Sequence, residues 1–216
     1  MPKCKILIQI FLFLATGIIC RGQKPFSEGT VVYGVTLTSQ ANQTFSGTYT
    51  FFIKGNQIRK EIKLNNGYQD VVLLNCNTNK VYSLQNRNGK KYAIELSMQE
   101  LQRRQTKFGG FKLTNETNDA KKIAGYNVFK ANVNYADGSS PEVYYTKDWQ
   151  PTQTITFERF PDARFLPVQF SYTDEHGMTM TFEAEKIDLE PVENSRFRIP
   201  ADYKMISYKE YKELSE

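Results

Sequence analysis

Residues 47–64 read GTYTFFIKGNQIRKEIKL, and this stretch decides the fold. Gly55-Asn56 lies between two runs that alternate apolar and polar residues, which is typical of a two-residue hairpin turn. With that turn, Lys54 pairs with Gln57, and the register of the whole hairpin follows. Because side chains alternate along a strand, the register sorts the residues onto two faces.

The two faces differ in polarity. The first carries Thr48, Thr50 and Phe52 opposite Lys63, Glu61 and Arg59. The second carries Tyr49, Phe51, Ile53, Ile58, Lys60, Ile62 and Leu64. A slip of one residue would bury the charged set, so we expect Ile53 opposite Ile58 and Phe51 opposite Lys60.

Lys60 is the only charged residue on the second face. One interpretation is that it meets the anionic head of a ligand held on that face, since binding cavities combine apolar walls with a few placed polar groups. The other is that it extends to water near a sheet edge, or protects that edge from aggregation. The sequence leaves both open.

The strands around the hairpin predict a meander. Strand-like runs cover 30–38, 67–76, 79–85 and 90–97, and turn signals near 75–79 and 86–89 separate the last three. Neighbours joined by short turns usually pair in space, so the sheet should be antiparallel. In the last run, Tyr92 and Ile94 share one face and join the candidate ligand-binding set.

The second half adds a helix and further hairpins. Ser97-Met98-Gln99-Glu100 has the form of a capping box, which predicts a helix over 98–106. Asp137-Gly138 predicts a hairpin turn, and another is expected near 175–177. Three prolines in 148–170 rule out a continuous strand, so that segment should cross the sheet, with a short helix between Pro151 and Phe160. A weak helix is expected over 207–214.

The N-terminus has the pattern of a signal peptide. Basic residues Lys3 and Lys5 precede an apolar run over 6–19, and we expect cleavage after Gly22. Removal of residues 1–22 would lower the formal net charge from +5 to +2, because the segment has three basic and no acidic residues. The chain should be extracytoplasmic, periplasmic or secreted. Lipid anchoring through Cys20 and a buried first helix are the alternatives.

The mature chain offers few catalytic groups. Only Cys76 would survive cleavage, so the monomer has no internal disulfide and relies on its core. His176 lies in a polar turn, and one histidine makes no zinc pattern. No nucleophile elbow, P-loop or dinucleotide motif is present, and no basic stripe suggests nucleic acid. We expect no enzyme activity, cofactor or metal; a hydrolase would need Cys76, His176 or two carboxylates to converge.

Three segments carry a resemblance. They are KIAGYNVFKANV (122–133), FLPVQFSY (165–172) with the hairpin that follows it to EAEKIDLEPV (183–192), and SRFRIPADYKMIS (195–207). They resemble a DUF4412-type family of secreted bacterial proteins of unknown function, similar in fold to the lipoprotein carrier LolA and to LppX. The resemblance covers most of 28–208.

The resemblance implies a curved half-barrel, closed on its hollow side by helices or loops, in an envelope protein of Gram-negative bacteria. Carriers of this shape hold acyl chains. Here only KPFSEG (24–29) precedes the first strand, where the carriers have a longer helix.

Together these observations predict a mainly β protein with a single curved antiparallel sheet and one or a few short helices covering the concave face. A signal peptide (1–22) precedes a single LolA-like domain (23–216). The expected function is non-enzymatic binding of an apolar or amphipathic, lipid-like ligand on the concave face. The alternative is an envelope scaffold or protein-interaction module without a cavity. We expect a monomer that associates peripherally with the envelope and does not bind nucleic acid.

Overall fold

The computed structural model describes residues 23–174 and 177–214. The predicted signal peptide and His176 lie outside the described residues. The strands of the large sheet are β2 (Glu28–Thr38), β3 (Thr44–Lys54), β4 (Gln57–Leu64), β5 (Gln69–Asn75), β6 (Lys80–Arg87), β7 (Lys90–Ser97), β8 (Lys112–Ile123), β9 (Tyr126–Asn134), β10 (Glu142–Thr146), β12 (Leu166–Thr173), β13 (Thr179–Asp188) and β14 (Lys204–Ser207). The other elements are β1 (Lys24–Phe26), β11 (Trp149–Pro151), helices α1 (Met98–Thr106) and α2 (Tyr208–Glu213), and the 3-10 turns η1 (Thr154–Thr156) and η2 (Asn194–Phe197).

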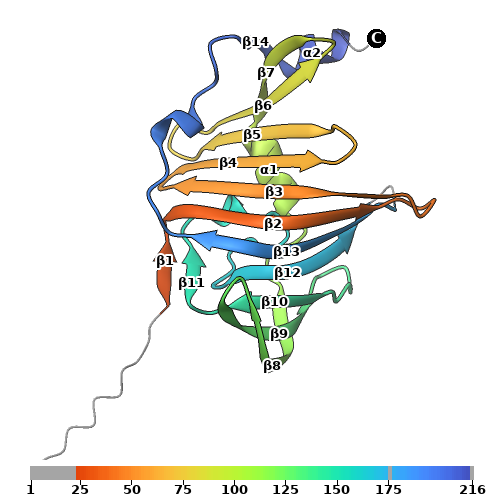
Figure 1. The fold of residues 1–216 in the computed structure, drawn as a ribbon, viewed down its shortest axis with the longest axis vertical. Helices are drawn as coiled ribbons and strands as arrows, with labels where there is room; N and C mark the ends of the chain where they lie inside the picture. Colours follow the sequence, from red (N-terminus) through yellow and green to blue (C-terminus); the bar gives the residue numbers. More distant parts are fainter. Residues whose placement is uncertain (1–22, 175–176, 215–216) are drawn as a thin grey trace, which may run out of the picture.

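The large sheet is open, and its strand order is β14-β7-β6-β5-β4-β3-β2-β13-β12-β10-β9-β8 (Figure 1). Its pairs are antiparallel except at one edge, where β14 runs parallel to β7. A separate parallel pair joins β1 to β11. The predicted fold class, mainly β with one large curved sheet and few helices, is confirmed. The sequence did not predict the parallel edge.

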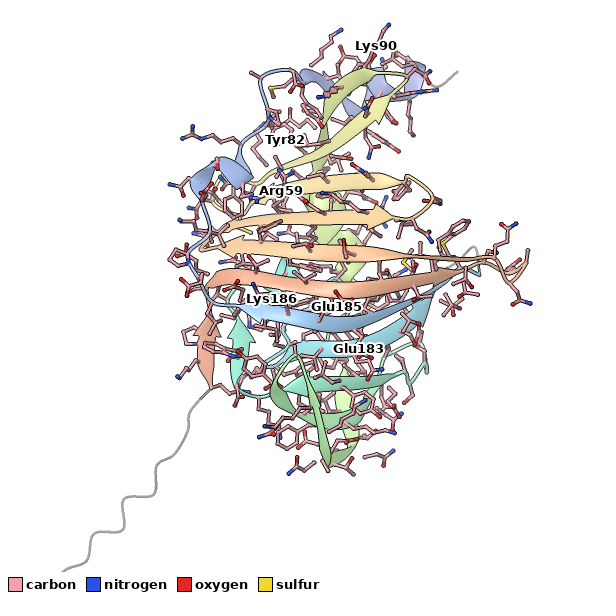
Figure 2. The ribbon with its side chains drawn as sticks, in the orientation of Figure 1. Arg59, Tyr82, Lys90, Glu183, Glu185 and Lys186 are labelled. Carbon is pink, nitrogen blue, oxygen red and sulfur yellow. The ribbon has the colours of Figure 1, made fainter. Side chains whose placement is uncertain are left out.

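The register of the opening hairpin is confirmed. Lys54 lies opposite Gln57, Ile53 opposite Ile58, and Phe51 opposite Lys60. Ile53 and Ile58 are buried, as the apolar face requires. Arg59, Glu183 and Glu185 instead lie on the face turned toward the viewer in Figure 2, with α1 behind the sheet. The polar residues that alternate with the buried apolar residues along these strands therefore lie on the convex face.

The segment after β10 crosses the concave face, as expected. Phe157, Phe160 and Phe165 are buried in the main core cluster. The ring of Phe157 lies 5.1 Å from that of Phe51 and 6.4 Å from that of Tyr33. The helix predicted between Pro151 and Phe160 is only the single turn η1. Between β11 and β12, packing of aromatic side chains rather than strand pairing holds this segment on the sheet.

Helix α1 occupies the predicted residues. The Ser97 side chain accepts a hydrogen bond from the Glu100 backbone N–H at 3.2 Å. The Glu100 carboxylate does not complete a capping box, because it binds Arg103 and Arg104 instead. The helix is attached through Met98, which is buried against Ile58, Leu74, Val81 and Ile155.

The C-terminal segment covers both faces of the sheet at the β5–β7 end. Ile199 and Tyr203 pack on the convex side against the cluster of Leu73, Leu84 and Ala93. On the concave side, Tyr92 and Ile94 pack with Ile206 and Tyr211. The predicted helix near the C-terminus is α2, and its first turn forms a full capping box between Ser207 and Glu210.

We predict that Ile53→Ala lowers the free energy of unfolding by about 2–5 kcal/mol, because it removes a fully buried side chain and leaves a cavity. Thr48→Ala, on the opposite face of the same strand, should change it by less than about 0.5 kcal/mol. Urea unfolding monitored by circular dichroism measures both. Equal losses in the two variants would contradict this assignment of the faces.

Candidate functional site

The concave face is not completely filled by the protein. One open hollow of about 690 Å³, the central hollow, lies between the sheet, α1 and the crossing segment. A second of about 470 Å³, the side hollow, adjoins it near β4 and β5. The two hollows share four lining residues, which are Tyr49, Lys60, Tyr172 and Phe182. Both volumes fall within the range of about 300–1,000 Å³ typical of small-molecule sites.

Aromatic side chains from three strands form the base of the central hollow. We call Tyr49, Phe51, Phe170 and Phe182 the aromatic floor. Tyr49 and Phe51 have ring centroids 4.7 Å apart, and Phe170 stacks on Phe182 at 4.7 Å. Burial raises the pKa of Tyr49 well above its usual value, with a smaller contribution from Glu158. The floor is therefore neutral and apolar at all ordinary pH values.

Tyr33 supports this floor from beneath. Its side chain is fully buried, and its ring meets those of Phe51, Phe170 and Phe182 edge-on. Its hydroxyl donates a hydrogen bond to the Pro167 carbonyl at 2.7 Å, which satisfies the buried polar group. The floor residues consequently have little freedom to move, and the base of the hollow is preformed.

Lys60 lies between the two hollows and is only 5% exposed. Its Nζ donates to the Ile155 carbonyl at 3.2 Å, and lies 3.9 Å from the Glu158 carboxylate and 5.6 Å from the Phe51 ring centroid. Burial lowers the pKa of the ammonium, while Glu158 opposes that shift. The interpretation of Lys60 as an edge guard or a solvent-reaching lysine is wrong. Strand β4 is paired on both sides, and the side chain is enclosed.

The other predicted site residues divide into two groups. Ile62 and Leu64 line the side hollow, together with Leu37, Phe45, Met178 and Met180. Ile53 and Ile58 are instead buried core residues, and Tyr92 and Ile94 lie under β14 and α2. We do not retain these four as candidates, because none of them lines either hollow.

The sequence interpretation missed the half of the site that comes from β12 and β13. Phe170 and Tyr172 alternate along β12, and Met180 and Phe182 alternate along β13. This period of two was visible in the sequence. Only the pairing of β13 with β2 brings these residues beside Tyr49, however, and that pairing joins segments about 150 residues apart.

Arg159 lies at the rim of the central hollow and is held by two rings. Its guanidinium carbon is 3.9 Å from the Tyr172 ring centroid and 4.3 Å from that of Phe108. The Tyr135 hydroxyl donates to its backbone carbonyl at 2.6 Å. Such contacts favour a cation and fix its direction. Arg159 thus adds a positioned positive charge to a hollow that has an aromatic floor and a charged rim.

Four carboxylates, those of Glu100, Asp137, Glu158 and Asp174, line the central hollow, whereas Cys76 lines neither hollow. Cys76 packs beside the Ile58 cluster, and burial raises the pKa of its thiol while Lys60 lowers it. Within 23–174 and 177–214, no set of three His, Cys, Asp or Glu side chains could hold a metal ion. In the same ranges, no helix has the length and apolarity needed to cross a bilayer.

These features define a class of protein: an open, curved β-sheet with an aromatic-floored hollow on its concave face. No protein-family model matches the sequence, and neither does any curated protein. A solved structure, the LolA superfamily protein NE2245 from Nitrosomonas europaea, is similar over 82% of this chain and 92% of that chain. The two share 12% sequence identity, with a TM-score of 0.42. The resemblance to the DUF4412-type family stays a prediction.

We predict that Lys60→Met raises the free energy of unfolding by about 1–2 kcal/mol, because replacing a buried ion-pair member by an apolar side chain of similar length removes a desolvation cost. Glu158 is 56% exposed and stays solvated after the change. Lys63→Met is the matched control: Lys63 lies on the convex face and is 57% exposed. Urea unfolding of both variants tests this, and a clear loss of stability in Lys60→Met would contradict it.

The stability gain should also depend on pH. Because the folded pKa of Lys60 lies below its usual value of 10.5, the folded state binds fewer protons than the unfolded state between those two values. Wild-type stability therefore rises with pH in that window relative to Lys60→Met, and the difference between the two proteins shrinks. Ionisation of the tyrosines affects the stability of both proteins equally, so it cancels in the difference between them. A difference that is constant from pH 7 to 10.5 would contradict the lowered pKa.

Proposed function

We propose that this chain is a non-enzymatic extracytoplasmic binding protein that holds an apolar or amphipathic, lipid-like ligand in its concave hollows. The observation that carries the proposal is the aromatic floor, which faces two adjoining open hollows of about 690 and 470 Å³. Apolar surface exposed to water costs roughly 25 cal/mol per Å². Phe51 and Phe182 are already buried, so a ligand recovers this energy by covering the partly exposed rings of Tyr49 and Phe170.

The side hollow suits a flexible chain. Its walls combine branched aliphatic side chains with Met178 and Met180. Methionine is unbranched and polarizable, so it adapts to ligands of irregular shape. Tyr68, which is 50% exposed, lies at the same hollow and provides further apolar surface. These properties support an acyl chain or similar group rather than a rigid polar metabolite.

The predicted signal peptide supports the location outside the cytoplasm. The alternative of a scaffold or protein-interaction module has less support, because it requires a concave face without a cavity. Under our proposal, purified protein carries a lipid that native mass spectrometry detects, and binds the neutral fluorescent probe N-phenyl-1-naphthylamine. An empty protein that does not bind this probe would favour the scaffold.

We predict that Met180→Trp weakens probe binding by about tenfold or more, because the larger ring fills the side hollow. Thr181→Trp is the matched control, since Thr181 is the next residue of β13, on the convex face and exposed. Fluorescence titration gives both dissociation constants, and circular dichroism checks that both variants fold. Equal affinities in the two variants would place the probe elsewhere.

A further inference from the structure

We propose that the hollows select amphiphiles with one apolar chain and an anionic head, and that Lys60 is the residue that makes this selection. The inference rests on the proposed function, which leaves the charge of the ligand open. It concerns the border between the hollows, where the aliphatic walls of the side hollow meet the charged rim of the central one.

The position of Lys60 matches the place where the head of such a ligand would lie. Lys60 lines both hollows, and Ile62 and Leu64 continue from it along β4 into the side hollow. Asp70, which lies opposite Ile62 in the pairing of β4 with β5, also lines the side hollow, and its carboxylate accepts hydrogen bonds from Ser83 at 3.2 Å and Gln85 at 2.6 Å. A negative head is repelled at Asp70 and attracted at Lys60, so the orientation of the ligand is set.

The charge of Lys60 is incompletely compensated by the protein. Its ion pair with Glu158 is 3.9 Å long, and Glu158 is 56% exposed, so water screens the attraction. Surface lysines of the same chain pair more closely: Lys91, Lys130 and Lys147 each lie 2.6 Å from a carboxylate. Buried charges are normally well paired because desolvation is costly. Nζ donates to the Ile155 carbonyl at 3.2 Å, and an anionic head beside it would add a close anionic partner.

Other acidic groups of the central hollow are engaged by their own turns or helix. Asp137 accepts hydrogen bonds from the backbone and hydroxyl of Ser139, and Asp174 accepts one from the Met178 backbone. Glu100 binds Arg103 and Arg104, which holds its pKa at about 2. Glu158 is therefore the carboxylate that a ligand must displace. Since its side chain is largely in water, displacing it costs little.

Arg159 strengthens the preference for an anion. It lines the central hollow with Lys60, and its stacking between Phe108 and Tyr172 holds the guanidinium in place. A cation fixed before binding loses little conformational entropy when a ligand arrives. Lys60 supplies the buried contact to the head, and Arg159 supplies a positioned charge at the rim.

The test compares three amphiphiles with the same twelve-carbon chain: dodecanoate, dodecyl phosphate and the neutral glyceride monolaurin. Each displaces N-phenyl-1-naphthylamine from the full chain at pH 7.5. We expect at least one anion to bind about tenfold or more tightly than monolaurin, since hydrogen bonds to charged groups exceed neutral ones in strength. The carboxylate and phosphate arms identify which head is preferred.

In Lys60→Met this preference should fall to about threefold or less, with monolaurin affinity retained or improved. Lys63→Met should keep the wild-type preference. Lys60→Gln provides a second neutral variant, so the test does not depend on the folding of one protein. If wild-type protein binds monolaurin as tightly as both anions, this inference fails while the proposed function stands. If it binds neither the probe nor any amphiphile, the proposed function fails as well.

Discussion

The register between β3 and β4 is the constraint on which the rest of the structure depends. Ile53 opposite Ile58 directs one face of the hairpin into the core, and the same alternation places Phe51 and Lys60 beside each other. A shift by one residue would turn Arg59, Glu61 and Lys63 toward the aromatic core, at a prohibitive desolvation cost. This pairing places Tyr49, Phe51 and Lys60 on the concave face, where the later strands and the crossing segment complete the site.

The hollow exists because the crossing segment is too irregular to fill the concave face. Between β11 and β12 it forms no strand and only the single turn η1, so it attaches at separate aromatic anchors such as Phe157 and Phe160. Lys60 places a charged group in the otherwise apolar contact between the sheet and these anchors. Burial of the Lys60 ammonium costs desolvation free energy, and burial of the surrounding apolar side chains offsets that cost. Such local costs are common at binding sites.

Local pairing could be predicted from the sequence, and distant pairing could not. The hairpin register and the bounds of α1 follow from short-range signals, namely Gly55-Asn56 and the Ser97–Glu100 cap. The depth of Lys60 could not be predicted, because it depends on Ile155, which lies 95 residues away. For the same reason the contribution of β12 and β13 to the site was missed, and Tyr92 and Ile94 were assigned to a surface that α2 and β14 cover.

The position of β2 has a consequence for how the chain folds. Strand β2 is the first of the large sheet in the sequence, yet it lies between β3 and β13, whose residues end at Asp188. During synthesis, β2 to β7 can form a meander early, but one edge of β2 remains unpaired until β13 has been made. An unpaired edge strand is a template for aggregation. The pairing of β13 with β2 therefore protects the N-terminal meander as well as completing the sheet.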